Sequence, residues 1–453
     1  MKHDTVLDAL SPYLQAGTFL LAFITFIYSA RETSKSAKRQ SIQVQRTQVA
    51  ELLKALGDPD ASVRAATVSA LAQYPDTGRY VIGLSLGEKS PSVVNAIATV
   101  LASTPKPSLD LAAAITRDLF ARRLYEACEL STAGLNTEAV ADIVGIKKWS
   151  LSRYLNTFDG KRAREDAENR HQKAALLGQF STGKPDNNAR KEIIDKIYET
   201  ENARLNITRI AEHIFSRAAQ SHEKICVHNM VLRNANITGL DISNWQFLDC
   251  DFEGTLFNSC DAKNTIFERC KLNGCFFRNA SLHDARISAC ELQEADFGTA
   301  RLKRAQFEDI PNAYKIHMNG AKVEGAGFTH CSLVQASMIG IMGNDATFNH
   351  CDLNGAEFTA ARTPGIIFRN CSLKGTDLSN ANLVKSQFAL SQLRGAVLKG
   401  TNMSGANFHK TEIADISKAD GLRHDGVLID DDPDAATADL VAALQGKRQS
   451  FTP

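Results

Sequence analysis

A bulky apolar residue recurs at every fifth position of the chain between Leu232 and Ile413. In most of these pentads a small residue, usually Ala, Cys, Ser or Thr, precedes the bulky one by two positions, as in Ala295-Asp296-Phe297. A period of five fits neither an α-helix nor a flat strand, whose side chains return to one face after about 3.6 and about 2 residues. The pattern instead predicts a solenoid, in which each short repeat stacks on its neighbours.

Identical residue types also recur twenty positions apart, which predicts the length of one coil. One column consists of Phe247, Phe267, Ile287, Phe307, Phe328, Phe348, Phe368, Phe388 and Phe408, and a second of Cys250, Cys270, Cys290, Cys331, Cys351 and Cys371. Both columns contain the same one-residue shift, before Phe328 in the first and before Cys331 in the second. If twenty residues make one turn, the Phe rings stack in the interior and the Cys side chains fill spaces too small for Leu.

The pentads resemble those of the pentapeptide-repeat family, whose loose consensus is Ala-(Asp/Asn)-Leu-x-x. Matching pentads begin with Ala356-Glu357-Phe358, Thr376-Asp377-Leu378 and Ala406-Asn407-Phe408. The resemblance implies a right-handed quadrilateral β-helix with one pentad on each side of a coil. For residues 227–420, this architecture amounts to about nine coils, stacked at the strand spacing of about 4.8 Å.

Eight of the ten cysteines occupy the small position of a pentad, and we interpret them as packing residues. No Cys-x-x-Cys pair occurs in the sequence, and no His accompanies the cysteines at the spacing of a zinc site. The sequence also contains no Ser-His-Asp grouping and no intact nucleotide-binding loop. We therefore expect no enzyme activity, no metal and no cofactor.

The N-terminal segment from Ala9 to Ala30 contains no charged residue. A helix of this length can cross the hydrocarbon core of a bilayer, so residues 1–31 are predicted to hold an extracytoplasmic N-terminus and a transmembrane helix. Four basic residues follow it: Arg31, Lys35, Lys38 and Arg39. The positive-inside rule then places the rest of the chain in the cytoplasm, anchored to a bacterial inner membrane. A buried helix of a globular domain is the alternative.

Helices are also predicted between the membrane segment and residue 158. Residues 32–56 are expected to form a linker helix, because they contain neither Pro nor Gly. The segment at 57–71 is then echoed thirty residues later by the segment at 87–101, with matching Gly, Ser, Val, Ala and Leu positions. These segments resemble HEAT-like repeats, in which paired helices stack, and they imply a HEAT-like domain over residues 57–158.

The segment at 137–155 has the spacing of a helix-turn-helix, with Ala141 and Gly145 four residues apart at the expected turn. In that arrangement Lys147, Lys148 and Arg153 would be available to contact DNA. The alternative is a helical hairpin that closes the HEAT-like stack, with Gly145 as a helix C-cap.

Helices are expected at both ends of the solenoid. Residues 159–226 are predicted to form a polar helical connector, in which an amphipathic helix at 203–219 covers the first coil and keeps its edge from pairing with another chain. Residues 421–453 are predicted to form a C-terminal cap helix, at 435–444, and a disordered tail. This helix either covers the last coil or mediates self-association into a homodimer or higher oligomer.

The segment at 308–317 interrupts the pentads and adds one residue to the array. It includes Pro311, which cannot donate to a β-ladder, so we expect a loop to bulge out here. Such a loop is either a feature of the local geometry or a contact for a partner through Asp309, Pro311 and Tyr314.

Charge balance limits the classes of partner. The whole chain has a formal net charge of +1, and residues 227–420 contain 19 Lys and Arg against 20 Asp and Glu. Some pentapeptide-repeat proteins mimic DNA, and such mimicry requires a strongly acidic surface. The near-neutral array argues against that role.

The sequence as a whole predicts an α+β multidomain protein with an N-terminal transmembrane helix, a HEAT-like helical region and a C-terminal β-helix. The function that we expect is a membrane-anchored cytoplasmic scaffold that binds a protein partner through its solenoid. Two alternatives stay open. One is a membrane-bound regulator that contacts DNA through 137–155, although nucleic acid is not the expected partner, and the other is a membrane-acting stress or defence effector.

Overall fold

The computed structural model describes residues 47–52, 54–71, 88–102, 112–113, 116, 127, 131, 137–144, 151–152, 155, 205–220, 224–413, 421–423 and 425–428. The chain divides into two compact units, Met1–Val81 and Ile82–Pro453, which we describe separately. The predicted transmembrane segment at 9–30 and the predicted cap helix at 435–444 lie outside the described residues. Among the residues that are described, no helix combines the length and the apolar character needed to cross a membrane.

The first unit contains helical residues at 47–52 and 54–55 and the helix α2 (Ala61–Leu71). Helix α2 begins directly after Asp60, whose carboxylate accepts hydrogen bonds from the backbone N–H of Ser62 at 2.7 Å and from its hydroxyl at 2.8 Å. This N-cap satisfies a backbone donor that the first helical turn leaves unpaired. The same hydrogen bonds lower the pKa of Asp60.

The second unit begins with α4 (Pro91–Ala102) and α6 (Thr137–Val144). Proline suits the first position of α4 because the first turn of a helix does not need its N–H. Helices α2 and α4 coincide with the two echoing segments, but they fall in different compact units. The described residues therefore do not show the stacked helix pairs of the HEAT-like domain expected at 57–158.

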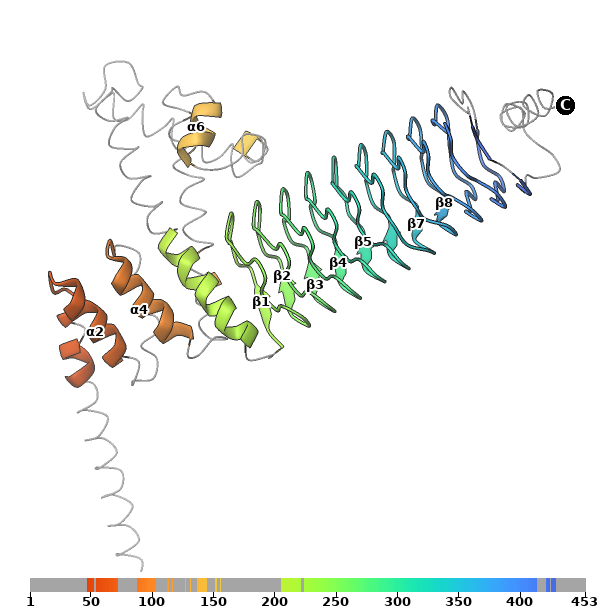
Figure 1. The fold of residues 1–453 in the computed structure, drawn as a ribbon. Helices are drawn as coiled ribbons and strands as arrows, with labels where there is room; N and C mark the ends of the chain where they lie inside the picture. The colour runs from red at the N-terminus through yellow and green to blue at the C-terminus, as the bar shows by residue number, and fades with distance from the viewer. Residues whose placement is uncertain are drawn as a thin grey trace, which may run out of the picture. The chain divides into compact units, whose positions relative to one another are not determined.

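A helix at residues 205–220 covers the start of the solenoid, next to β1 (Cys226–His228) (Figure 1). The ring centroid of Phe215 lies 5.4 Å from that of Trp245 and 6.2 Å from that of Phe247. The carboxylate of Glu212 accepts a hydrogen bond from the backbone N–H of Asn236 at 2.6 Å, so it satisfies a donor at the edge of the first coil. The contacts agree with the capping role expected for 203–219.

The solenoid contains one parallel sheet of eight short strands in sequence order, each three residues long. After β1 the strands are β2 (Gln246–Leu248), β3 (Ile266–Glu268), β4 (Arg286–Ser288), β5 (Gln306–Glu308), β6 (Gly327–Thr329), β7 (Thr347–Asn349) and β8 (Ile367–Arg369). Partners in the sheet such as Phe247 and Phe267 are twenty residues apart. Between β5 and β6 the separation is 21, as for Phe307 and Phe328. The twenty-residue coil is therefore confirmed.

Isolated parallel bridges form three further columns with the same spacing, so each coil has four sides. We call the sheet side A, and the columns that begin at Val231, Asn236 and Asp241 sides B, C and D. The eight strands define about seven turns of the nine or so expected. Further bridges continue the stacking of side A beyond β8, as between Gln387 and Asn407.

A left-handed backbone conformation at one residue of each pentad, two positions after the bulky one, turns the chain from side to side. Asn229 (φ 53) and Gly239 (φ 73) are examples, and Asn and Gly adopt this conformation more readily than other residues do. Arg269 (φ 52) occupies the same position in another coil, so stacking on the neighbouring coils enforces the turn where the residue type does not favour it.

The prediction of a bulging loop at 308–317 is wrong, because regular pairing of the coils resumes directly after the one-residue insertion. Glu291 bridges to Asn312 and Asp296 to His317, so a regular side B resumes directly after Pro311. Pro311 lies at the corner between sides A and B, where the ladder requires no N–H from it. The bulky-residue count missed this pentad because its centre is the small residue Ala313, which is buried.

The array also extends past residue 420, where the sequence analysis ended it. Asn402 bridges to Arg423 and Asn407 to Leu428, in both cases 21 residues along the chain. A second one-residue insertion therefore precedes this last described coil. Because of this insertion, the later pentads lie one position away from where the five-residue count expects them, so the count did not detect them.

Candidate interaction surface

Each pentad directs two side chains inward and three outward. The bulky residue, which we call the centre, and the small residue two positions before it, which we call the slot, are both inside; Phe328 and Ala326 are 0% exposed. The remaining positions, one between slot and centre and two at the corner, carry the outer surface. The chemistry of the outer surface therefore depends on these three positions.

The Phe column forms a pile of rings along side A, with near-parallel planes. Ring centroids are 4.7 Å apart for Phe307 and Phe328, 4.5 Å for Phe328 and Phe348, 5.2 Å for Phe348 and Phe368, 5.2 Å for Phe368 and Phe388, and 4.9 Å for Phe388 and Phe408. The pair Phe247 and Phe267 stacks in the same way at 5.0 Å. Such offset stacking adds to the free energy of burial and fills the interior.

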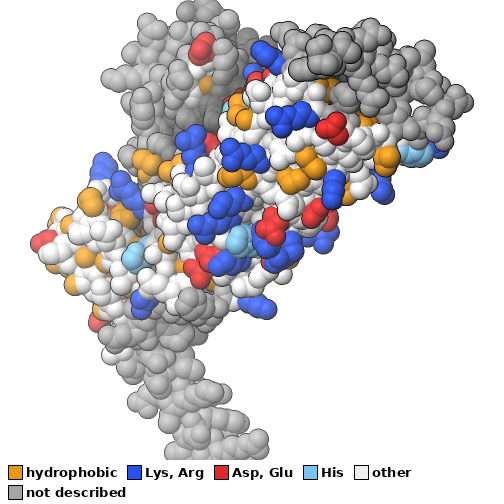
Figure 2. Space-filling model, turned by 45° about the vertical axis from the view of Figure 1, so that its right-hand side comes forward, with side chains coloured by type: hydrophobic (Ala, Val, Ile, Leu, Met, Phe, Trp, Pro, Cys, Tyr) orange, Lys and Arg blue, Asp and Glu red, His pale blue; other side chains and the backbone are white. Residues whose placement is uncertain are grey.

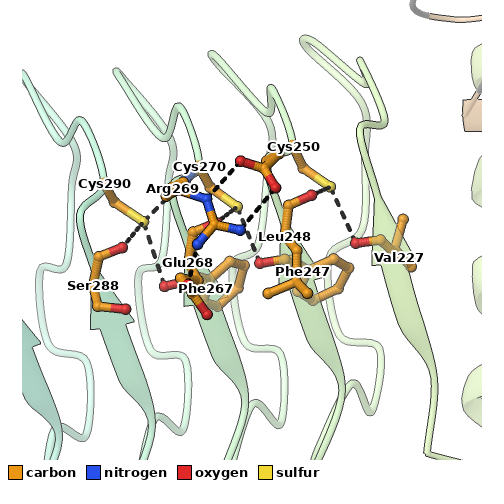
Figure 3. Close-up of polar contacts among 11 residues, drawn as sticks. Val227, Phe247, Leu248, Cys250, Phe267, Glu268, Arg269, Cys270, Ser288 and Cys290 are labelled. Carbon is orange, nitrogen blue, oxygen red and sulfur yellow. Dashed lines mark hydrogen bonds and ion pairs between the residues drawn. The ribbon is translucent and has the colours of Figure 1, made fainter.

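The Cys column lies in the slots, where the thiols are buried and unbridged. Each of these thiols donates to a backbone carbonyl of the preceding coil; the Sγ of Cys270 lies 3.2 Å from the carbonyl oxygen of Phe247 (Figure 3). Thr265 occupies a slot on another side, and its hydroxyl donates to the carbonyl of Ile242 at 2.8 Å. The slot therefore suits small side chains that can donate a hydrogen bond, as well as Ala. Burial raises the pKa of the Cys260 thiol to about 12, which suppresses its reactive thiolate form.

Ion pairs connect consecutive coils along the corners. The guanidinium of Arg269 contacts both carboxylate oxygens of Asp249, at 2.7 and 2.9 Å (Figure 3). Arg304 contacts Asp284 in the same two-point way at 2.6 Å. These hydrogen bonds lower the pKa of both carboxyl groups. Exposed pairs of this kind add little stability, but they hold the charged side chains in fixed positions. Side chains of Lys and Arg are mixed with those of Asp and Glu on the visible face (Figure 2).

Side C carries a groove of about 830 Å³. Its floor consists of the outward residues Phe276, Asp296 and His317, which stack through the bridges from Phe276 to Asp296 and from Asp296 to His317. One wall is formed by Glu294 and Lys315 at the corner with side B. The opposite wall is formed by Arg278, Asn279, Thr299 and Asn319.

Gly298 creates the space between the residues of the second wall. It occupies the outward position at which the adjacent coils carry Arg278 and Asn319, and a Cβ there would lie 2.9 Å from a carboxylate oxygen of Asp296. That carboxylate accepts hydrogen bonds from the backbone N–H of Gly298 at 2.8 Å and from Nε of Arg278 at 2.5 Å. Asp296 is only 6% exposed, so its charge is compensated within the floor.

The residues expected to form a partner loop instead lie on regular coils. Asp309 contacts His330, with 3.3 Å between Oδ1 and Nδ1, at the corner of side A. The hydroxyl of Tyr314 donates to Oε1 of Gln335 at 2.8 Å. The Tyr314 ring also lies below Lys315, whose Nζ is 5.2 Å from the ring centroid. Tyr314 thus contacts a wall residue of the groove, and partner binding by these residues stays a prediction.

The possible DNA contacts Lys147, Lys148 and Arg153 lie outside the described residues. Within the segment, α6 provides the first predicted helix, and Leu151 and Leu155 are buried, as both the helix-turn-helix and the helical hairpin require. Over the ranges that the structure describes, no three or more His, Cys, Asp or Glu side chains gather to hold a metal ion.

The groove was not predicted from the sequence. Its residues come from three coils and from outward positions, which follow no repeat. The only local signal is the column of corner residues Gly254, Gly274 and Glu294, in which two glycines are followed by a long side chain.

Comparison with known proteins bears on the array. A model described as pentapeptide repeat region matches residues 240–314 and 340–417. HetL, a pentapeptide repeat protein involved in heterocyst differentiation regulation from the cyanobacterium Nostoc sp. strain PCC 7120, is 19% identical over 47% of this chain and 92% of its own, with a TM-score of 0.26. Full-length QnrB1, a plasmid-mediated fluoroquinolone resistance protein, is 19% identical over 51% of this chain and 99% of its own, with a TM-score of 0.28. No curated protein matches the sequence. The family match and the coil of four five-residue sides together identify residues 240–314 and 340–417 as a pentapeptide repeat region.

Proposed function

We propose that this chain is a membrane-anchored cytoplasmic scaffold that binds a protein partner through the outer faces of its solenoid and has no catalytic activity of its own. The observation that supports partner binding is that each pentad uses two residues for the interior and leaves three on the surface. The centre and slot are committed to packing and backbone hydrogen bonds, as at Phe328 and Cys270. Chemical variation is therefore concentrated in the outward positions.

The outer faces suit a protein partner because they combine fixed charges with exposed apolar side chains. Arg269 and Arg304 are held by carboxylates of the preceding coil. Phe276, Ile339 and Met342 are 39%, 40% and 37% exposed. A surface with both kinds of group can supply an apolar contact area and a polar rim, as protein interfaces do.

The membrane part of the proposal is supported by the uncharged segment at 9–30 and the basic residues that follow it. Carbonate extraction of membranes from cells that express the full chain tests it. The wild-type chain should stay in the membrane fraction, and a Leu21→Arg/Phe23→Arg variant should be released. A wild-type chain that carbonate extracts completely would refute the anchor.

The binding part is tested by cross-linking the full-length chain in native membranes and quantifying the proteins recovered with it. A scaffold should recover at least one protein whose yield saturates as its abundance is raised. The matched control is a Gly343→Asp variant, in which a side chain would meet the backbone of Glu324 and disturb the stacking of the coils. If no protein shows saturable recovery with the wild-type chain, the solenoid is not a scaffold for a protein partner.

A further inference from the structure

The side C groove retains more unused hydrogen-bond donors than acceptors. The carboxylate of Asp296 is occupied by Arg278 and by the backbone N–H of Gly298. Oδ1 of Asn319 accepts the backbone N–H of Ile339 at 2.9 Å. Because a backbone N–H can only donate, this contact fixes which end of the amide is oxygen. The amide nitrogen of Asn319 then has no partner among the described residues.

Two cations add to these donors. The side chain of Arg278 is 63% exposed, and within the described part of the chain only its Nε is engaged, by Asp296. Lys315 is exposed and forms no ion pair with a described residue; its Nζ lies over the Tyr314 ring. The only acidic side chain on the walls is Glu294. The groove therefore complements an acceptor that carries negative charge.

The groove also has an apolar end. The outward positions of side C run from Leu256 through Phe276 and Asp296 to His317 on successive coils. The Phe276 ring is 39% exposed, and the cationic end, at Lys315, lies two coils further along. At about 4.8 Å per coil the two ends are about 10 Å apart. A peptide in the extended polyproline II conformation spans this distance with about three residues of about 3.1 Å each, and side chains three residues apart then lie on the same face.

We propose that the groove binds an extended segment of a partner protein in which an apolar side chain and a carboxylate are three residues apart. The apolar side chain packs on Phe276, and the carboxylate accepts hydrogen bonds from Lys315 and Asn319. Arg278, between the two ends, donates to a backbone carbonyl of the segment. This inference rests on the proposed function, since it names the chemistry of the partner that the solenoid binds.

Fluorescence anisotropy with the full-length chain and two labelled peptides of the same composition tests the inference. The first peptide is Ser-Phe-Ser-Ser-Glu-Ser, with the spacing of the groove, and the second is Ser-Ser-Phe-Glu-Ser-Ser, in which Phe and Glu are adjacent. We expect the first to bind at least fivefold more tightly and to weaken as salt is raised, because the Lys315 contact is exposed. Equal binding of the two peptides, or no binding at millimolar peptide, would overturn the proposal.

A matched pair of charge reversals locates the site. Lys315→Glu should weaken the first peptide at least fivefold. Lys322→Glu changes an exposed lysine on side D in the same way and should leave binding unchanged. The proposal is also wrong if both variants weaken binding equally, since the effect would then come from net charge.

The cross-linking experiment separates this inference from the proposed function. If the wild-type chain recovers a saturable partner and Lys315→Glu recovers it equally well, the scaffold stands and the groove is not its binding site. If Lys315→Glu loses the partner while Lys322→Glu keeps it, the groove assignment is supported. A wild-type chain without a saturable partner defeats the scaffold, and the proposal about the groove fails with it, whatever the peptides show.

Discussion

Removing one ring from the Phe pile should loosen the solenoid locally. Phe348 is fully buried, with ring centroids 4.5 Å from Phe328, 5.2 Å from Phe368 and 6.0 Å from Phe358. Phe348→Ala removes these contacts and leaves a cavity, at a cost of about 3–5 kcal/mol. We expect the upper half of that range because three aromatic neighbours lose a partner, and each such pair contributes about 0.5–1.5 kcal/mol beyond its buried area.

The assay is amide hydrogen exchange of the full-length chain. Each coil of a solenoid contacts only its neighbours and the chain has two compact units, so a single global unfolding transition would not report on one coil. The free energy of local opening should fall by about 4–5 kcal/mol, so exchange on the coils of residues 327–369 should accelerate by about 700-fold to about 4000-fold. Coils near Phe247 should keep the protection of the wild type. Ile339→Ala, at an exposed position on side C, is the matched control and should change protection by less than about threefold.

Two results would refute this reasoning. An acceleration below tenfold at residues 327–369 would mean that the burial and the stacking of the ring contribute little to the stability of these coils. Equal acceleration in every coil would mean that the solenoid unfolds as one cooperative unit, and not by separate coils.

Three further predictions concern polar groups. Thr363 is a fully buried pentad centre whose hydroxyl has no hydrogen-bond partner among the described residues. Thr363→Val should therefore stabilise the chain by about 1–3 kcal/mol in urea denaturation, and a loss of stability would contradict the unsatisfied hydroxyl. Arg269→Gln should raise the lowered pKa of Asp249 towards 3.8 in an NMR titration. In the wild type, the stability that the Arg269–Asp249 pair adds should be present above pH 3.8 and disappear as the pH falls through the lowered pKa. Cys260 should resist thiol reagents at pH 8 in the folded chain, because burial raises its pKa to about 12, and it should react after denaturation. Site-resolved mass spectrometry measures the labelling of both states. Rapid labelling of the folded chain would contradict the prediction and show that the slot is accessible.

The coil could be predicted from the sequence because packing dictates the inward positions. Phe328 and Phe348 recur at twenty residues because each stacks on the other, and most slots hold small side chains. The one-residue insertion at Pro311 was recognised, but its segment was interpreted as a loop. Ala313 occupies a centre and Ile310 a slot, the reverse of the usual sizes, so a count based on bulky residues passed over a regular side.

The groove could not be predicted because outward positions are under no common packing requirement. Its shape depends on Gly298 lying between Arg278 and Asn319 on adjacent coils, residues that are about twenty positions apart in the sequence. No spacing rule connects them until the coil length and the insertion at Pro311 are both known. The placement of Lys315 beside the floor depends on that extra residue, which shifts every later position by one.

The contact between Phe215 and Phe247 has a consequence for assembly. The two rings are nearly parallel, with an interplanar angle of 7°, so a helix supplies the aromatic layer that an earlier coil would otherwise provide. A second molecule that docked head to tail at this terminus would have to displace that ring and expose the apolar face of the helix to water. Growth of the rod into a filament from its N-terminal end is therefore disfavoured by the molecule itself, and copies that associate would meet along their flanks or at the opposite end.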